Sequence, residues 1–247
     1  METTNELSRF DQLVGNGHEI VATAMVEYGV DILAVVDEID AKISHNVIGF
    51  NNPDALWYLH ANAFAHQLAN KYDTTFTIAA GIISAVSPRM PWLRNKRVAE
   101  SILKNFRKYD SLSALDAAKA IKLGMGANVA MAIKIARGES ISDTLTGTKR
   151  RSFYNNIVEP LTGIDSVTVD TWMLNAFVNA CGITKKDAEK FVRANYRALG
   201  GTGAGYYVMA EAVRMVAQAH DVPANFVQAA YWCAVSGSAD GGRSDIS

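Results

Sequence analysis

The sequence is poor in cysteine and lacks a long apolar run. Its two cysteines, Cys181 and Cys233, are too few for a zinc cluster or a disulfide framework, so we expect two reduced, buried thiols. No apolar stretch approaches the roughly 20 residues that a membrane span needs, and the polar, acidic N-terminus does not resemble a secretory signal. We therefore expect a cytoplasmic protein that does not enter a membrane.

The chain also lacks an excess of charge of either sign. Its 24 Lys and Arg residues nearly balance its 25 Asp and Glu residues, which gives a formal net charge of -1. This balance argues against a generally basic protein that coats nucleic acid. With 49% hydrophobic and 20% charged residues, the composition excludes disorder, collagen-like repeats and a coiled coil as the main architecture. The length suits one large domain or two interlocked lobes.

The distribution of charge along the chain is uneven. Residues 1–84 carry 3 basic and 11 acidic side chains, residues 85–151 carry 14 and 5, and residues 152–247 carry 7 and 9. The central block has a net charge of +9 and suits a polyanionic partner such as DNA. The alternative is a set of solvated helix faces that pair with the acidic N-terminal third.

Apolar residues recur at three- and four-residue steps along most of the chain, and no alternating strand pattern competes with them. We therefore expect an all-α protein. Residues 1–235 are expected to form a single globular helical unit, and residues 236–247 a flexible C-terminal tail. The expected helices lie at about 18–42 (despite Gly29), from Pro53 to Leu68, and at about 76–86, 93–108, 113–121, 127–137, 149–158, 171–181, 184–199, 205–219 and 222–235.

The segment from Leu145 to Phe153 predicts a hairpin of two helices joined by a glycine turn, within about residues 139–158. The glycine lets the backbone approach a ligand closely, and the second helix adds the positive end of its dipole. An ordinary turn between two helices is the alternative. The residues that we expect to hold a phosphate of a polyanionic partner here are Gly147, Thr148, Lys149, Arg150 and Arg151.

Asp170 follows the short extended piece Val167–Val169 and precedes a helix, in a loop region that we place at about residues 160–172. A carboxylate in this position can be the helix N-cap, which accepts hydrogen bonds from backbone N–H groups. Asp170 comes shortly after the glycine hairpin and the basic loop, and this combination of motifs weighs against a role as a cap alone.

The order of these motifs resembles that of the helix-hairpin-helix DNA glycosylases, in which a glycine/proline-rich loop is followed by an aspartate. The hairpin of that family commonly has the pattern L-P-G-V-G-x-K-T-A and is followed by V-D-T-H-V. Here Leu145, Gly147 and Val169-Asp170-Thr171 match, and the similarity covers about residues 74–181. The sequence departs from the pattern at three positions: Thr146 for the proline, Lys149 for the second glycine and Trp172 for the histidine.

The resemblance implies two interlocked helical lobes with the extruded nucleotide in the cleft between them. It also implies that Asp170 lies at the base pocket and either stabilises the oxocarbenium-like sugar or activates the attacking nucleophile. Family members that also cleave the strand carry a lysine at the position of Arg151, and an arginine cannot form a Schiff base. We therefore expect a monofunctional enzyme, with weak lyase activity left open by Lys149. Two cysteines exclude the family's four-cysteine iron–sulfur cluster, and no cofactor or metal is expected.

The loop from Val86 to Leu93 is the candidate for the element that enters the duplex, since it carries apolar side chains between prolines. Met90 or Leu93 would fill the space that the flipped base leaves, and Trp92 is a further candidate for the wedge or the base pocket. Arg89 and Arg94 would contact phosphates. The alternative is a proline-stiffened surface loop that Trp92 anchors to the core.

Three residues near the hairpin and Asp170 are further candidates for the base pocket: Tyr154, Asn155 and Trp172. They could stack on the base or hydrogen-bond to it, and core packing is the alternative for the aromatic ones. In the last predicted helix, Gln228 is expected to be a buried hydrogen-bonding residue.

Together these patterns predict a monomeric DNA glycosylase. It would hydrolyse the N-glycosidic bond of a flipped, damaged or modified base in double-stranded DNA and leave an abasic site. One candidate substrate is a hydroxymethylated or glucosylated cytosine of phage DNA, excised in anti-phage defence. The alternatives are a non-catalytic helix-hairpin-helix DNA-binding protein, in which Asp170 is a cap alone, and a helical protein-interaction module with an acidic partner.

Overall fold

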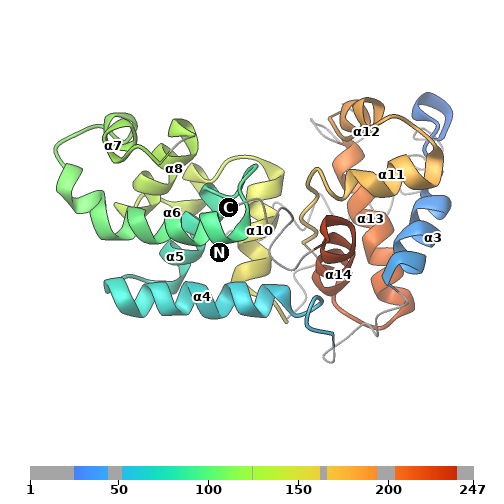
Figure 1. The fold of residues 1–247 in the computed structure, drawn as a ribbon, viewed down its shortest axis with the longest axis horizontal. Helices are drawn as coiled ribbons and strands as arrows, with labels where there is room; N and C mark the ends of the chain where they lie inside the picture. The colour runs from blue at the N-terminus through green and yellow to red at the C-terminus, as the bar shows by residue number, and fades with distance from the viewer. Residues whose placement is uncertain (1–24, 44–51, 124, 162–165, 194–203, 238–247) are drawn as a thin grey trace.

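The computed structural model describes residues 25–43, 52–123, 125–161, 166–193 and 204–237, and every regular element in these ranges is helical (Figure 1). The all-α prediction is therefore confirmed for this part of the chain. The helices are α3 (Ile32–Ile43), α4 (Trp57–Tyr72), α5 (Phe76–Ala85), α6 (Trp92–Asn105), the 3₁₀ helix η1 (Phe106–Tyr109), α7 (Ala114–Ile121), α8 (Gly126–Ala136), α9 (Ile141–Thr144), α10 (Thr148–Val158), α11 (Leu174–Cys181), α12 (Lys185–Val192), α13 (Ala204–Ala219) and α14 (Ala224–Ser236).

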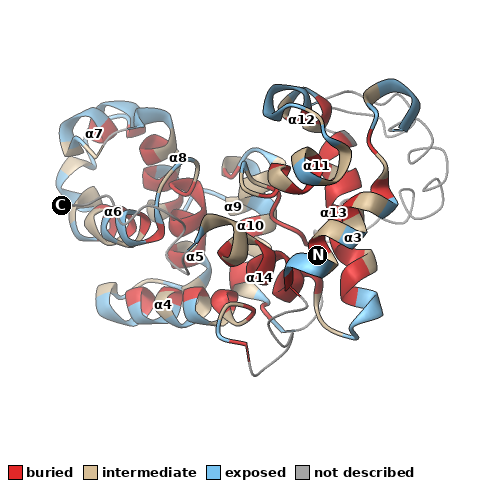
Figure 2. Cartoon of the chain, turned by 45° about the vertical axis from the view of Figure 1, so that its right-hand side comes forward, coloured by how far each residue is buried: buried red, intermediate tan, exposed pale blue. Residues whose placement is uncertain are grey.

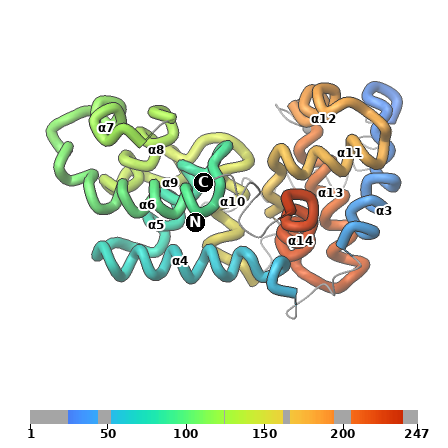
Figure 3. Tube along the Cα trace, in the orientation of Figure 1, coloured from blue at the N-terminus to red at the C-terminus, as the bar shows by residue number. Residues whose placement is uncertain are grey.

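Two hydrophobic clusters hold these helices together. One contains buried residues of α3 and α11–α14, and the other is built mainly from α4–α8 and α10. The path of the chain in Figure 3 shows α3, from the N-terminal part, beside the C-terminal α13 and α14, while α4–α10 lie to the other side. Trp232 of α14 packs against both clusters. The two groups of helices are therefore connected by packing as well as by the chain.

The predicted helix at about 18–42 is wrong in its described part, because it is interrupted at Gly29. Residues 25–28 are helical, but Gly29 adopts φ +66° and ends that turn. A new helix, α3, begins at Ile32, and Asp31 Oδ1 accepts a hydrogen bond from Leu33 N at 2.9 Å. The apolar period continues across this break, which explains why the sequence pattern predicted one helix. Residues 18–24 lie outside the described ranges.

Helix α5 confirms the prediction of a buried helix at about 76–86. Thr75 caps it by accepting a hydrogen bond from Ile78 N at 3.2 Å. Every residue from Ala79 to Ala85 is buried, and α5 is mostly red in Figure 2. The helix ends before a loop with prolines at positions 88 and 91, and α6 begins at Trp92. The loop that we expected to enter the duplex is thus placed at the edge of the second cluster.

Most other helix boundaries agree with the sequence-based ranges to within a few residues. Helix α11 starts at Leu174 instead of 171, because residues 171–173 form a turn. Helix α14 continues to Ser236, and the rest of the predicted tail, from residue 238, is outside the described part of the chain, as are residues 162–165 and 194–203. No helix in the described ranges is long and apolar enough to span a membrane.

Candidate functional site

A partly open pocket with a cavity volume of about 60 Å³ is lined in part by Lys149 and Phe153 of α10. Three tryptophan side chains supply much of its wall: Trp57 from α4, Trp92 from α6 and Trp232 from α14. The ring of Trp57 lies 4.8 Å from that of Trp92 and 5.4 Å from that of Trp232, measured between centroids. Flat aromatic walls of this kind suit a planar ring as ligand.

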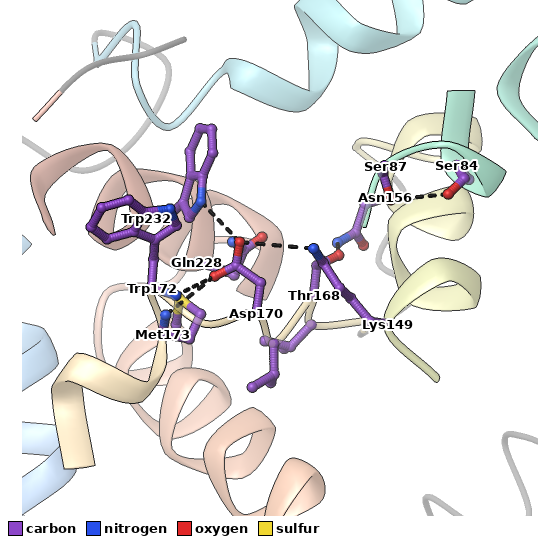
Figure 4. A network of polar contacts seen from close by, with 12 residues as sticks. Ser84, Ser87, Lys149, Asn156, Thr168, Asp170, Trp172, Met173, Gln228 and Trp232 are labelled. Carbon is purple, nitrogen blue, oxygen red and sulfur yellow. Dashed lines mark hydrogen bonds and ion pairs between the residues drawn. The ribbon is translucent and has the colours of Figure 1, made fainter. Parts of the chain in front are cut away.

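Asp170 contributes a carboxylate to this pocket, and its two oxygens have different partners (Figure 4). Oδ1 accepts hydrogen bonds from Trp172 N at 2.8 Å and Met173 N at 3.3 Å. Oδ2 accepts one from Trp232 Nε1 at 3.1 Å and lies 3.9 Å from Lys149 Nζ. Asp170 thus caps the turn at residues 171–173 and not α11 itself, whose N-cap is Met173 without a side-chain hydrogen bond. This arrangement leaves Oδ2 for the pocket.

The extended segment that carries Asp170 is fixed by side chains from two other helices. Tyr206 of α13 donates a hydrogen bond to Val167 O at 2.8 Å and accepts one from Val169 N at 3.0 Å. Asn156 of α10 donates to Thr168 Oγ1 at 3.1 Å. Residues 166–169 are buried, so these hydrogen bonds satisfy polar groups that water does not reach. The carboxylate thus projects from a rigid support.

The short helix α9 and the helix α10 are joined by a tight turn at Gly147. This glycine adopts φ +90°, a conformation that L side chains rarely adopt, and no side chain caps the start of α10. Arg150 Nε donates to Thr146 O at 2.6 Å, and Arg151 Nε donates to Leu145 O at 2.9 Å. The two guanidinium groups therefore hold the carbonyl groups of the turn in place.

Lys149 is the basic residue of the turn that reaches the pocket. Its side chain and that of Phe153, four residues later on α10, both line the pocket, as expected for neighbours on one helix face. Arg151, two residues further along, lies on a different face and contacts the turn. The side chains of Lys149 and Asp170 are 31% and 16% exposed, so the ion pair is only partly shielded from water.

Tyr58 and Gln228 form a buried polar pair in the pocket wall. Burial raises the pKa of the Tyr58 phenol. The phenol donates a hydrogen bond to Gln228 Oε1 at 2.6 Å. Gln228 is buried, as predicted for a hydrogen-bonding residue of the last helix. This pair connects α4 to α14 next to the aromatic walls.

The structure brings four of the expected site residues to the pocket: Met90, Trp92, Lys149 and Asp170. Trp92 is buried against Trp57, so it also anchors the loop to the core, as the alternative for that loop proposed. Four others are not among the pocket-lining residues, namely Leu93, Tyr154, Asn155 and Trp172. Asn155 donates to Ser166 Oγ at 3.1 Å. Arg89 and Arg94 are exposed in the loop and in the first turn of α6.

More than half of the residues that line the pocket were not predicted as individual site residues. The residues concerned are Trp57, Tyr58, Ser87, Asn95, Phe153, Thr168, Ala229 and Trp232, in addition to Gln228, which was expected to be buried but was not assigned to the site. Most of them lie on α4, α6 and α14, far from Asp170 in sequence, so no local spacing connects them to it. Within the described ranges, no three His, Cys, Asp or Glu side chains are grouped to hold a metal ion.

Comparison with known proteins identifies a family for this chain. No curated protein and no solved structure matches it. A family model described as a family of unknown function, DUF7178, matches residues 51–239, a range that includes the pocket, the glycine turn and Asp170. The chain belongs to the DUF7178 family.

Proposed function

We propose that the protein is a DNA glycosylase, which hydrolyses the bond between a flipped base and its sugar and leaves an abasic site. The observation that carries this proposal is the pairing of Asp170 Oδ2 with Lys149 Nζ, 3.9 Å apart, in an aromatic-walled pocket directly next to a glycine turn. A base needs flat walls, the developing positive charge on the sugar needs a carboxylate, and the DNA backbone needs donors.

We interpret α9, the turn at Gly147 and α10 as a helix-hairpin-helix motif. Because a glycine precedes α10 and no side chain caps it, the amides of its first turn are suited to bind a phosphate. Arg150 and Arg151 support this role indirectly, since they fix the turn carbonyls. We likewise interpret the two hydrophobic clusters as two lobes and the pocket as part of the cleft between them.

The proposed chemistry is hydrolysis through an oxocarbenium-like sugar. The C1′–N bond breaks and the oxygen of water forms the new bond to C1′. One proton of that water is lost as a hydroxyl group remains on C1′, and the departing base takes up one proton, so the step balances. The two amides on Oδ1 hold the Asp170 carboxylate in one orientation, so no reorganisation is needed when positive charge develops near Oδ2. Lys149, a partly exposed ammonium donor that lines the pocket, is suited to hydrogen-bond the departing base.

The loop between α5 and α6 supplies the proposed duplex contacts. Met90 is half-buried and lines the pocket, so it is suited to fill the gap that the flipped base leaves. Leu93 is 40% exposed on the first turn of α6 and can insert beside it. Arg89 and Arg94 are exposed in this loop and in the first turn of α6, and they are suited to contact phosphates.

The decisive experiment compares Asp170→Asn with wild-type protein on a panel of duplexes. The panel carries uracil, alkylated purines, oxidised bases, and hydroxymethylated and glucosylated cytosine, and each reaction is scored for abasic sites. We expect wild-type protein to release one of these bases and Asp170→Asn to lose at least a hundredfold in rate with unchanged DNA affinity. Asp187→Asn is the matched control, because Asp187 is an exposed carboxylate in the first turn of α12.

The other outcomes decide between the remaining possibilities. Base release by Asp170→Asn at the wild-type rate contradicts the mechanism. Salt-sensitive duplex binding without abasic sites on any substrate identifies a non-catalytic DNA-binding protein. Absence of duplex binding at low salt favours a protein-interaction module.

The position of Lys149 makes strand cleavage testable as well. Its amine lies at the pocket, whereas the position expected from the family motif, Arg151, faces the turn. Borohydride would trap a Schiff base between Lys149 and the abasic sugar if lyase chemistry occurs. We expect a monofunctional enzyme, hence no trapped complex with wild-type protein. A complex that disappears in Lys149→Arg and persists in Lys134→Met, an exposed lysine of α8, would overturn that expectation.

A further inference from the structure

The outer face of α6 carries basic side chains without ion-pair partners. The buried residues of this helix face the second hydrophobic cluster, and exposed and buried positions alternate along it (Figure 2). Its exposed charged residues are Arg94, Arg97 and Lys104. With 3.6 residues per turn, these three side chains project within about 80° of one another. The exposed Arg107 and Lys108 follow directly in η1, and we call these five residues the basic face.

No carboxylate of the described residues forms an ion pair with any of these five cations. The single acidic residue of α6 is Glu100, whose Oε1 accepts hydrogen bonds from Lys71 Nζ at 2.6 Å and Tyr72 Oη at 3.0 Å. These two hydrogen bonds lower the pKa of Glu100, and the charge of Lys104 contributes least to that shift. The basic face therefore presents charge of one sign to solvent.

Helix α12 provides a comparison within this chain. Its exposed lysines, at positions 185, 186 and 190, are interspersed with Asp187 and Glu189. Opposite charges three or four residues apart stabilise a helix, and like charges at this spacing destabilise it. Arg94 and Arg97 of α6 are like charges three residues apart. A bound polyanion would offset this repulsion, whereas salt and water only screen it.

We propose that the basic face is a second contact surface for the phosphate backbone of duplex DNA. From Arg94 to Lys104 the helix rises about 15 Å, and a DNA strand carries one phosphate for about every 3.4 Å of its axis. This part of the face therefore spans about four phosphates of one strand. Three of the five cations are arginines, whose planar guanidinium group binds phosphate through two hydrogen bonds. Leu93 is the one exposed large apolar residue of α6, which is too little apolar surface for a lipid interface.

The basic face lies on the side of α6 that points away from the pocket. Trp92 and Asn95 line the pocket, and Arg97 projects about 140° and 160° away from them around the helix axis. Of the basic face, the proposed function assigns only Arg94 to the duplex. This inference rests on the proposed function for the identity of the polyanion, and it adds a surface that holds the duplex apart from the chemistry. Removing charge from the other residues of the face should weaken duplex binding without slowing base release at saturating DNA.

The test combines Arg97→Gln, Lys104→Gln and Lys108→Gln in one α6 variant. Binding of a fluorescent, unmodified duplex is measured by anisotropy between about 50 and 200 mM salt. Each phosphate contact contributes about 0.9 to the slope of log affinity against log salt. We expect the slope of the α6 variant to be shallower by about 2 to 3, and its affinity at the lowest salt to fall roughly tenfold or more.

The matched control combines Lys185→Gln, Lys186→Gln and Lys190→Gln on α12. It removes the same charge from exposed positions, so its slope should stay close to that of wild-type protein. A further variant with Arg97→Lys, Lys104→Arg and Lys108→Arg keeps the charge and should keep the slope. If circular dichroism shows that the α6 variant does not fold, the three substitutions are measured singly, with an expected decrease of about 0.9 each.

The outcomes separate this inference from the proposed function. An unchanged slope in the α6 variant overturns the inference, and so does an equal decrease in the α12 control. Absence of duplex binding by wild-type protein overturns it as well and favours an acidic protein as the partner. Base release from duplex DNA with an unchanged slope in the α6 variant would leave the glycosylase standing while the inference fails. A shallower slope in that variant without base release from any duplex would do the reverse.

Discussion

Trp232 Nε1 donates a hydrogen bond to Asp170 Oδ2 at 3.1 Å, across 62 positions of sequence. The indole belongs to α14 and packs against both hydrophobic clusters, so the carboxylate is positioned by the same residue that joins the two groups of helices. The geometry of the candidate site and the packing of the two clusters are therefore coupled. A change that shifts α14 relative to α4 would alter the environment of Asp170 before it unfolds the protein.

Trp232→Phe tests this coupling, because phenylalanine keeps an aromatic wall and removes the N–H donor. Hydrogen bonds to charged groups contribute about 1.5–3 kcal/mol, so we expect the rate of base excision to fall roughly tenfold to a hundredfold with little change in duplex affinity. The measurement is single-turnover base release together with duplex binding.

The neighbouring Tyr231 provides the control for Trp232. Its hydroxyl is buried and has no hydrogen-bond partner among the described residues, so Tyr231→Phe should leave base release unchanged and the free energy of unfolding equal or slightly higher. Equal rates in Trp232→Phe and wild-type protein would contradict a role for the indole N–H at Asp170.

Tyr206→Phe should destabilise the segment that carries Asp170. The substitution removes the donor to Val167 O and the acceptor for Val169 N, both buried. Leaving buried groups unsatisfied costs about 1–3 kcal/mol each, and we expect a loss of that order in urea unfolding. Since Tyr206 acts through Asp170, base release at saturating DNA should also slow while duplex affinity is retained. Tyr72→Phe removes a hydrogen bond to the partly exposed Glu100 and should cost less than about 1 kcal/mol.

Gly147→Ala should disturb the turn between α9 and α10. An alanine at φ +90° is strained, and such conformations cost about 1–3 kcal/mol. We expect a lower midpoint of thermal unfolding and weaker duplex binding, because the turn amides are displaced. Gly126→Ala is the matched control, since Gly126 begins α8 with open space around it. Equal duplex affinity of the two variants would exclude the turn as a DNA contact.

The features that were predicted correctly from the sequence depend on residues that are close together in the chain. The helical period depends on neighbours three and four residues apart, so most helices were predicted correctly. The hydrogen bonds that Asp170 accepts from the amides of Trp172 and Met173 are local as well, although the helix that the sequence placed directly after Asp170 begins at Leu174. Gly29 shows the limit of this approach, because the apolar period passes through a residue whose backbone turns away from the helix.

The remaining parts of the site depend on contacts between distant helices. Trp57, Asn95 and Trp232 meet because α4, α6 and α14 pack around one pocket, and no spacing in the sequence indicates this. The positive charges at the start of α10 did not indicate which side chain enters the pocket. Arg150 binds a carbonyl group of the turn, whereas Lys149 reaches the pocket. Adjacent residues on α10 point in directions about 100° apart. The alignment of a short motif does not determine which of them faces the pocket.

The buried tyrosines predict loss of stability at alkaline pH. Burial raises the pKa of Tyr58, Tyr206 and Tyr231 above the usual value, which is about 10 for a free tyrosine. Above that pH the unfolded chain releases these protons and the folded protein retains them. The free energy of unfolding therefore falls as pH rises, by up to about 1.4 kcal/mol per pH unit for each tyrosine. Below about pH 9 the same groups are protonated in both states and have no effect.

Urea unfolding between pH 8 and pH 11, with phenolate absorbance recorded in parallel, measures this effect. These three tyrosines should ionise together with unfolding, whereas exposed tyrosines ionise in the folded protein. Tyr231→Phe removes one of the three groups, so the slope of stability against pH above pH 10 should decrease by up to about 1.4 kcal/mol per pH unit. An unchanged slope in Tyr231→Phe would show that the Tyr231 phenol reaches water in the folded state, contrary to its burial in the first cluster.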